Sequence, residues 1–420
     1  ESAPPAGMRD FVVVGCGPAG SRFARRAAEV GHDVLAFEQG EVGEPLACSG
    51  HVSTDIWAFT PDGARERLLQ NVVYGARFHL EDPTPPDAAT APDEQSDRGD
   101  TPTPGDRTPA SDGGVEAVAA DAANGSADLA AGRREAPDGP GYHFYKDEQV
   151  SNVIDRVGLD RELADAAREA GADLREHHTV LDVDERTDHV AVEVRGPDGV
   201  ETHRARMVAG CDGPKSRVRR DVGLPDPGEL LHGVLGFTDE ADAGDFVDVH
   251  LTVPRFFAWR IPRGEAGVEY GLAVPPGGDV RERFEAFCGS YGVEPDRRCS
   301  GLIPIGPPDT VTSERAFLVG DAAAQTKPFT GGGIRYGMTA ADHAVDTIDP
   351  ENPATLADYE RAWRDDLARE IRLGHWVRRA YSLPEPVQKL GLRTVSGKIG
   401  VHMDRPSTVF SREQLRSLLR

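Results

Sequence analysis

The segment from Phe11 to Gly40 restricts the possible folds of this chain more than any other stretch. It reads FVVVGCGPAGSRFARRAAEVGHDVLAFEQG, which predicts a short buried strand, a tight glycine-rich turn, an amphipathic helix and a second strand. Gly15 permits the turn, Gly17 lets a pyrophosphate approach the N–H groups that open the helix, and Gly20 lets the helix pack closely on the strand.

An acidic residue stands where such a fold needs one. Glu38 closes the second strand 18 residues after Gly20, where its carboxylate can accept hydrogen bonds from the hydroxyls of an adenosine ribose. A glycine pattern alone also serves ordinary strand–helix packing. The strand before it, the helix after it and the acid behind it together predict a Rossmann-like nucleotide-binding domain.

The charge of the chain is strongly one-sided. There are 71 acidic and 47 basic residues, a formal net charge of −24, and only five of the basic residues are lysines. This composition is typical of a cytoplasmic protein from a halophile, because concentrated salt screens charge repulsion within a few ångströms. An acidic mesophilic enzyme with a disordered tail is the alternative. We expect no nucleic-acid partner, because a negative surface repels phosphates.

Neither a targeting signal nor a metal-binding cysteine pattern can be identified in this sequence. No run of 18 apolar residues exists, and the opening ESAPPAG lacks the apolar segment of a secretory signal. We expect Met8 to be the true start and residues 1–7 to be a dispensable tail. The five cysteines form no metal pattern and fit a reducing compartment; the spacing of Cys288 and Cys299 permits a disulfide without requiring one.

A loop with a thiol follows the second predicted strand. The loop contains Cys48 and Ser49 between Pro45 and Gly50, and His51 follows Gly50. It leaves the carboxyl end of the sheet, where ligands bind in such folds. Cys48 either faces a ligand or is a small buried apolar residue. His51 is expected to be a hydrogen-bonded loop residue.

Residues 81–140 differ in composition from the rest of the chain. They follow an expected strand over Asn71 to Leu80 and contain 14 acidic residues, four arginines, no aromatic residue and no isoleucine. Such a segment cannot bury enough apolar surface to offset its ordering entropy. We predict a disordered, solvent-facing insertion, with a regulatory or partner-binding role as the alternative.

Regular structure is expected again from residue 141. A helix with Leu159 and Leu163 on one face is followed by strands at 179–183, 190–194 and 206–210, the last running into CDGP. Arg156, just before the helix, is placed either to meet a phosphate or to pair with a neighbouring carboxylate.

The region from Leu230 to Cys299 alternates between apolar and polar residues with turns between, which predicts a mostly antiparallel sheet. Its most apolar piece, PRFFAWRIPRG, is either ordinary sheet core or the wall of a hydrophobic substrate site. Beyond it, a strand at 316–319 ends at Asp321, and Gly331 to Gly333 open a helix whose amides can stabilise negative charge. The chain after Pro350 is expected to be helical.

Three motifs in this order, GCGPAG with Glu38, CDGPKSRVRR and FLVGDAAAQTKPFTGGGI, resemble those of FAD-dependent oxidoreductases of the aromatic-hydroxylase type. The resemblance implies FAD as the cofactor, with Asp321 on the ribityl chain. It further implies that Arg156 contacts FAD and that the backbone of Val180 meets the adenine. The predicted cofactor-binding residues are Gly15, Gly17, Ala19, Gly20, Glu38, Ala47, Cys48, Gly50, Arg156, Val180, Asp321, Gly333 and Ile334.

More narrowly, the chain resembles the geranylgeranyl reductases, in particular the archaeal digeranylgeranylglycerophospholipid reductases. PLACSGHVS resembles their cysteine-containing loop, and FAWRIP resembles their aromatic-x-Trp-x-aromatic-Pro motif, which implies Phe257, Trp259 and Pro262 at the substrate. The match covers nearly all the chain except residues 1–7 and 81–140. Phe257 stands where Tyr is common and Ile261 where Phe is common, so no tyrosine hydroxyl is available here as a proton donor.

The resemblance implies an α/β fold in three parts. A Rossmann-like FAD-binding domain takes residues 8–44, 141–225 and 300–345, and a mostly antiparallel β substrate domain takes 45–80 and 226–299. A helical C-terminal region takes 346–420.

The implied reaction is saturation of C=C bonds in the geranylgeranyl chains of archaeal ether-lipid precursors, in a halophilic archaeon. Such alkenes are not polarised, so hydride transfer must be joined to protonation, and Cys48 is the candidate catalytic proton donor. The electron donor is a ferredoxin or NAD(P)H. The location is cytoplasmic, with peripheral contact on the inner face of the membrane as a possibility. A flavin monooxygenase, a quinone-linked flavin dehydrogenase and a non-catalytic lipid-binding flavoprotein remain as alternatives.

Overall fold

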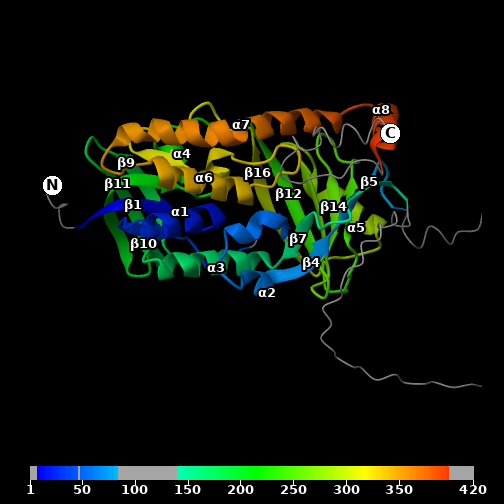
Figure 1. Ribbon diagram of the computed structural model, residues 1–420, viewed down its shortest axis with the longest axis horizontal. Helices are drawn as coiled ribbons and strands as arrows, with labels where there is room; N and C mark the ends of the chain where they lie inside the picture. Colours follow the sequence, from blue (N-terminus) through cyan, green and yellow to red (C-terminus); the bar gives the residue numbers. More distant parts are fainter. Residues whose placement is uncertain (1–6, 46–47, 84–139, 397–420) are drawn as a thin grey trace, which may run out of the picture.

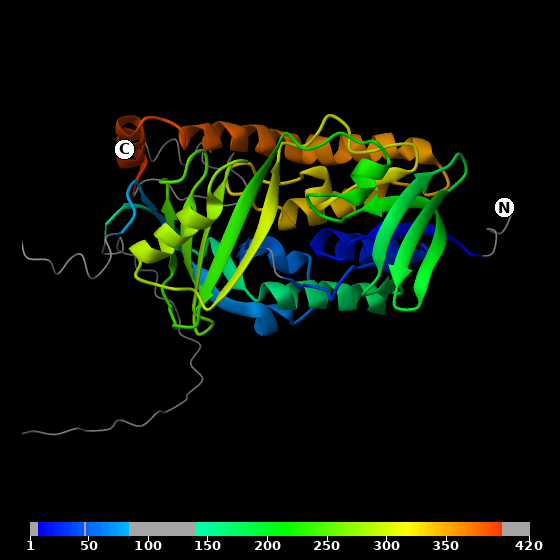
Figure 2. The same ribbon diagram turned by 180° about the vertical axis from the view of Figure 1, so that it is seen from behind.

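The structure is a computed structural model that describes residues 7–45, 48–83 and 140–396. Two large β-sheets lie at opposite ends of the molecule, and the long helix α7 (Leu356–Ala380) runs along both of them (Figure 1, Figure 2). Within the described residues, no helix is both long enough and apolar enough to cross a membrane.

The first sheet has seven strands in the order β8-β2-β1-β11-β10-β9, with β17 beside β11. Pairing is parallel from β8 to β11 and between β11 and β17, whereas β9, β10 and β11 form an antiparallel meander. The strands are β1 (Met8–Val14), β2 (Val34–Phe37), β8 (Asp173–Arg175), β9 (Thr179–Glu185), β10 (Val190–Gly196), β11 (Gly199–Gly210) and β17 (Ala316–Leu318).

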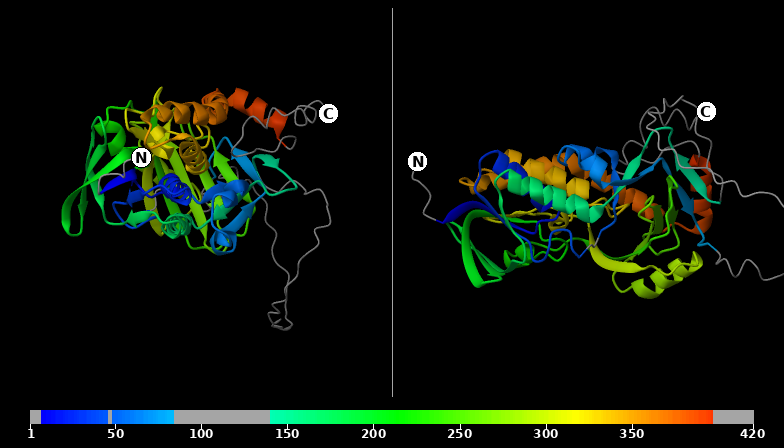
Figure 3. Two further views of the ribbon diagram at one scale, coloured as in Figure 1. Left: turned by 60° about the vertical axis from the view of Figure 1, so that its left-hand side comes forward. Right: turned by 90° about the horizontal axis from the view of Figure 1, so that it is seen from below.

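Helices cover this sheet because each one presents an apolar face to it. Helix α1 (Pro18–Glu29) packs between α3 (Arg156–Glu169) and α6 (Ile334–Thr347), and the right panel of Figure 3 shows these helices on one side of the strands. The rings of Phe11, Phe23 and Phe317 meet edge to face in the buried layer between them. The short helix α4 (Arg217–Asp221) lies against β9.

The second sheet also has seven strands, in the order β16-β12-β15-β14-β13-β5-β6. All of its pairs are antiparallel except β5 with β13. Helix α5 (Val280–Ser290) covers one face through Phe284 and Phe287. The strands are β5 (Gly75–His79), β6 (Tyr142–Tyr145), β12 (Glu229–Thr238), β13 (Phe246–His250), β14 (Ala258–Pro262), β15 (Val268–Val274) and β16 (Arg297–Ile305).

The chain also forms a small third sheet, and one expectation about the strands is wrong. The single strand expected over Asn71 to Leu80 is two strands, because the chain changes sheets at Tyr74, whose N–H donates to the Asp245 carbonyl. Before this point the chain pairs with β7, and after it with β13 and β6. The small sheet consists of β3 (His51–Ser53), β7 (Ser151–Ile154) and β4 (Leu69–Val73), with the helices η1 (Thr54–Ala58) and α2 (Ala64–Leu68) beside it.

The C-terminal part of the described chain is helical, as predicted. Helix α7 buries Tyr359, Trp363, Leu367 and Ile371 in the core of the first sheet and its helices, and α8 (Glu385–Val395) follows it. The short helices η3 (Gly320–Ala323) and η4 (Pro353–Thr355) complete the set. The predicted fold class, α/β with a second mostly antiparallel sheet and a helical C-terminal region, is confirmed.

Two of the predicted domain ranges extend beyond the described residues, and one predicted boundary falls inside a strand. Residues 84–139 of the predicted acidic insertion and 397–420 of the C-terminal region lie outside the described residues. The boundary expected at residue 299 falls inside β16, which pairs along its length with β12 of the antiparallel sheet.

Candidate active site

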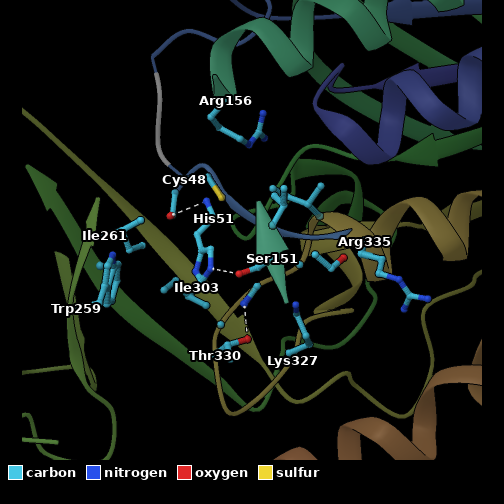
Figure 4. Close-up of a pocket in the computed structure, with 18 of the residues that line it drawn as sticks. Cys48, His51, Ser151, Arg156, Trp259, Ile261, Ile303, Lys327, Thr330 and Arg335 are labelled. Carbon is cyan, nitrogen blue, oxygen red and sulfur yellow. Dashed lines mark hydrogen bonds between the residues drawn. The ribbon is translucent and has the colours of Figure 1, made fainter. Parts of the chain in front are cut away.

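A cavity of about 370 Å³ lies between the two halves of the molecule. One side of it is formed by the glycine-rich turn after β1 and by the start of α6, and the other side by apolar residues of the second sheet. In Figure 4, Cys48 and Arg156 lie at one end of the pocket, with Trp259, Ile261 and Ile303 on the sheet side. Its volume is in the range of small-molecule and cofactor sites.

Gly15 and Gly20 have the structural roles in the glycine-rich turn that the sequence indicated. Gly15 has a φ of +92°, and a Cβ there would lie 2.5 Å from the Cys211 carbonyl oxygen. A Cβ on Gly20 would lie 2.0 Å from the Gly15 carbonyl oxygen, so this glycine allows helix and strand to touch. Gly17 has nothing within 4 Å of its Cβ position and lines the cavity with Ala19, leaving open space at the N-terminus of α1.

Glu38 lies at the end of β2, behind this turn rather than on the cavity wall. Its carboxylate accepts hydrogen bonds from the N–H groups of Cys16 (2.8 Å) and Gln39 (2.9 Å), and burial raises its pKa. Both of its oxygens retain lone pairs for further donors. Val180 is buried in β9 opposite Val194 and does not line the cavity.

Asp321 and the glycines before α6 meet at the cavity. Asp321 lies in η3 directly after β17, and burial raises its pKa to about 6 against the opposing effect of the Arg156 cation. A Cβ on Gly333 would lie 2.4 Å from Asp321 Oδ1, so only glycine fits beside this carboxyl group. Gly333 and Ile334 both line the cavity at the N-terminus of α6.

Arg156 pairs with a carboxylate, which is one of the two interpretations that its sequence position allowed; contact with a phosphate stays a prediction. Its guanidinium pairs with Asp160 at 2.5 Å, and both side chains are buried. It also lines the cavity, and its buried Nε has no hydrogen-bond acceptor among the described residues. Burial raises the pKa of the Cys48 thiol, while the charge of Arg156 and a hydrogen bond from it oppose this rise. The thiol therefore lies beside a permanent cation.

The second sheet provides an apolar wall. Phe257 and Trp259 line the cavity from β14 and the residues before it, and the rings of Phe256 and Phe257 stack with centroids 4.4 Å apart. Pro262 ends β14 but does not line the cavity. Other apolar residues of the wall are Val234, Leu235, Val247, Val249, Ile261, Leu302 and Ile303.

The indole of Trp259 is held by two residues of the neighbouring strand. A Cβ on Gly271 would lie 2.3 Å from Trp259 Cε2, so the indole lies flat over this glycine. Trp259 Nε1 donates to Glu269 Oε1 at 2.9 Å. Glu269 is fully buried, and burial raises its pKa against hydrogen bonds from Trp259, Ser49 and the Gly50 backbone. One carboxylate thus links the apolar wall to the loop that carries Cys48.

Sequence reasoning missed several residues of this site. The His51 Nε2 and Ser151 Oγ atoms are 2.7 Å apart on adjacent strands at the cavity. His51 is hydrogen-bonded as expected, but it begins strand β3 rather than lying in a loop. Lys327 lines the cavity and is 5% exposed. Glu269 left a signal, since it is the one acidic residue in the otherwise apolar and aromatic strand VEYGLAV.

The predicted site residues thus fall into groups. Those that line the cavity are Gly17, Ala19, Cys48, Arg156, Phe257, Trp259, Asp321, Gly333 and Ile334. Gly15, Gly20 and Glu38 lie behind it, and Gly50 packs on β7, where a Cβ would lie 2.3 Å from the Ile154 carbonyl oxygen. Ala47 lies outside the described residues. Cys288 and Cys299, whose spacing permitted a disulfide, are both free thiols.

These features define an FAD-binding oxidoreductase. The open space at Gly17 can accommodate a phosphate of a dinucleotide, and Arg156 Nε, which has no acceptor among the described residues, can donate a hydrogen bond to it. A family model described as an FAD binding domain matches residues 115–291.

The relatives narrow the class. Digeranylgeranylglycerophospholipid reductase 1 of Methanopyrus kandleri is 30% identical over 405 residues, covering 90% of this chain and 91% of that protein. Digeranylgeranylglycerophospholipid reductase 2 of Methanothermobacter thermautotrophicus is 27% identical, covering 86% and 85%. The chain belongs to the digeranylgeranylglycerophospholipid reductase family.

Solved structures agree on the fold. A geranylgeranyl bacteriochlorophyll reductase-like protein from Thermoplasma acidophilum superposes with a TM-score of 0.74 at 21% identity, covering 98% of this chain and 96% of that one. The p-nitrophenol 4-monooxygenase of Pseudomonas putida superposes with a TM-score of 0.64 at 16% identity, covering 98% of each chain.

Proposed function

We propose that this protein is an FAD-dependent reductase that saturates C=C bonds in the geranylgeranyl chains of archaeal ether-lipid precursors. The observation that carries the proposal is the two-sided cavity. Its cofactor side has Gly17, Asp321 and Gly333, and its other side is an apolar wall that includes Phe257 and Trp259. An isoprenoid chain on that wall would lie next to the flavin in a site with little water.

Bound FAD, once reduced, would supply a hydride to an alkene that has no polarising group. The other alkene carbon then needs a proton, and we propose that the Cys48 thiol donates it. Burial keeps this thiol protonated at neutral pH, since it raises the pKa. The adjacent Arg156 guanidinium would stabilise the thiolate left after the transfer.

We propose that the other residues of the cavity bind and orient. Asp321 would accept hydrogen bonds from the ribityl hydroxyls, Glu38 from the adenosine ribose, and the N–H groups after Gly17 would donate to the pyrophosphate. Phe257 and Trp259 would hold the chain flat and exclude water, which keeps a proton on Cys48 from being lost to solvent. The electrons would come from a ferredoxin or NAD(P)H.

An anaerobic experiment tests the proposed function. The purified FAD-loaded protein is reduced with dithionite, and geranylgeranyl glycerophospholipid is added in detergent. We expect flavin reoxidation together with a mass gain of two hydrogens for each double bond saturated. Reduced flavin that persists with the lipid present would contradict the proposal and would favour a lipid-binding flavoprotein without turnover. Reoxidation that needs oxygen and gives a hydroxylated product would favour a monooxygenase.

We also propose that the protein works in the cytoplasm, against the inner face of the membrane that holds its substrate. The apolar surfaces of such a lipid keep it in the bilayer, so the protein must either approach the bilayer or receive the lipid from a carrier. Fractionation of cells at their own ionic strength tests this. Recovery of the protein with the membrane, and its release by a wash that leaves integral proteins behind, is the expected result.

A further inference from the structure

The end of helix α7 carries a second hollow, of about 540 Å³, outside the cavity of the proposed active site. Four arginines line it, and Glu229 is the only carboxylate among the described residues of its wall. This balance is the reverse of the balance in the chain as a whole, which carries 71 acidic and 47 basic residues. The lining residues are Glu229, Arg255, Arg372, His375, Trp376, Arg378, Arg379 and Ser382.

The positive charge of this hollow is only partly neutralised within the described residues. Glu229 accepts from Arg378 at 2.8 Å and from Arg255 at 3.1 Å, so one carboxylate serves two guanidinium groups. Arg379 stacks over the Trp376 ring, 4.6 Å from its centroid. The pKa of His375 is lowered by burial and then by the charges of Arg378 and Arg379, against the opposing effect of Glu229.

Exposed apolar side chains lie beside these charges. Of the six large apolar side chains that are exposed among the described residues, four are in this region. They are Trp376 (66% exposed), Leu383, Val387 and Leu390, the last two on α8. Lys389 and Arg393 lie on the same short helix. A helix with apolar residues on one side and cations beside them suits the interface of an anionic bilayer, where Trp is favoured.

The hollow is separated from the active-site cavity by one aromatic layer. The Arg378 guanidinium lies 5.7 Å above the Phe256 ring, and Phe256 stacks on Phe257, which lines the cavity. Tyr381, at the C-terminal end of α7, packs edge to face on Phe257 with centroids 5.9 Å apart. A bilayer surface at the end of α7 would therefore lie next to the wall that the isoprenoid chain is proposed to contact. Figure 1 shows α8 and the end of α7 at the same end of the molecule as the second sheet.

We infer that the end of α7 and helix α8 dock the protein on an anionic phospholipid surface, with lipid phosphates in the arginine-lined hollow. The purpose of this docking, which is access to a lipid substrate, rests on the proposed function. Guanidinium groups bind phosphates in a bidentate manner, and each basic residue near an anionic membrane adds attraction that falls with ionic strength.

Flotation of FAD-loaded, full-length protein with vesicles tests this inference. Vesicles of phosphatidylglycerol are compared with vesicles of phosphatidylcholine, at the lowest salt concentration at which the protein stays folded. We expect the protein to float with phosphatidylglycerol and not with phosphatidylcholine. The double variant Arg372→Glu and Arg379→Glu should lose at least tenfold in partitioning, and Trp376→Ala should lose less.

A charge-matched control separates the surface from the overall charge. Arg220→Glu with Arg281→Glu changes the net charge equally at two exposed arginines on other elements, and it should leave flotation unchanged. Three results would overturn the inference: equal loss of flotation in both double variants, equal flotation with both lipids, or binding of inorganic phosphate in the hollow without any flotation. Reoxidation of the reduced wild-type flavin by detergent-dispersed lipid tests the proposed function separately, because no vesicle is present in that assay.

Discussion

Replacement of Asp321 by Asn should stabilise the protein without its cofactor and weaken its binding of FAD. The carboxyl group of Asp321 is enclosed beside the cavity, and burial raises its pKa from 3.8 to about 6. At 1.36 kcal/mol per pKa unit, this rise corresponds to about 3 kcal/mol of unfavourable free energy when the carboxylate is charged in the folded apo-protein.

The pH dependence follows from the direction of that shift. Between pH 3.8 and about 6 the folded apo-protein holds a proton on Asp321 that the unfolded chain has already released. The favourable contribution of this bound proton to the unfolding free energy is therefore complete below pH 3.8, and it is lost as the pH rises to about 6. The amide of the Asp321→Asn variant cannot titrate, so the difference in unfolding free energy between the variant and the wild type should grow by about 3 kcal/mol from about pH 4 to about pH 7.5.

FAD binding should respond in the opposite direction. If Asp321 accepts the ribityl hydroxyls, the loss of a hydrogen bond to a charged group, worth about 1.5–3 kcal/mol, should weaken FAD binding by about 10- to 100-fold at about pH 7.5. In the wild type, FAD affinity should rise with pH through about 6, where the carboxylate forms. A variant that was merely misfolded would lose both stability and affinity.

Urea unfolding of the apo-proteins from about pH 4 to about pH 7.5 and fluorescence titration with FAD measure the two effects. Asp182→Asn is the matched control, because Asp182 is an exposed aspartate on β9. Parallel stability curves for Asp321→Asn and the wild type across this pH range would refute the reasoning about burial. Unchanged FAD affinity would refute the ribityl assignment.

Three further substitutions have definite expected outcomes. Cys48→Ala should slow lipid-dependent flavin reoxidation by about 100-fold or more while FAD still binds, and Cys288→Ala, on the buried face of α5, should not; equal rates would remove Cys48 as the proton donor. Gly271→Ala should lower the unfolding free energy by about 1–3 kcal/mol and change the Trp fluorescence, because the added Cβ meets the indole at 2.3 Å; an unchanged melting temperature would contradict this packing. Glu269 is a buried acid with a raised pKa, so its ionisation should lower the unfolding free energy as the pH increases. Glu269→Gln should remove this fall, whereas Glu265→Gln, at an exposed position, should not. A pH–stability curve of Glu269→Gln that matches the wild type would count against a buried charge at Glu269.

The local part of the fold was predictable from the sequence. Strand β2 coincides with the apolar run Val34 to Phe37, which the sequence predicts as the second strand because it lies between a helix-ending glycine and an acid that begins the next loop. Strand β15 (Val268–Val274) lies in the region from Leu230 to Cys299 for which the sequence predicts a mostly antiparallel sheet. These segments are specified by periodicity and by turn residues a few positions away, and no distant contact is needed to place them.

Features that depend on distant contacts were not predictable. The residues before and after Tyr74 have the same β pattern, so the pattern alone does not reveal that the two halves pair in different sheets. The side-chain contact between Ser151 and His51, and the position of Ile303 on the cavity wall, follow from strand pairing between segments far apart in the sequence. The roles proposed for Cys48, Arg156 and Asp321 remain predictions, although the structure places all three at one cavity.

The pairing of β5 with β6 has a practical consequence. These two strands flank residues 80–141, and Phe78 pairs directly with Tyr142 while its ring meets that of Phe144 at 5.2 Å. The two ends of the intervening segment are therefore held together by the sheet itself, and the entropy of closing a loop grows only slowly with its length. The hairpin is thus a permissive site for engineering. A tight turn could replace the segment, or a fused electron-transfer domain could be tethered there, with the glycine-rich turn left as it is.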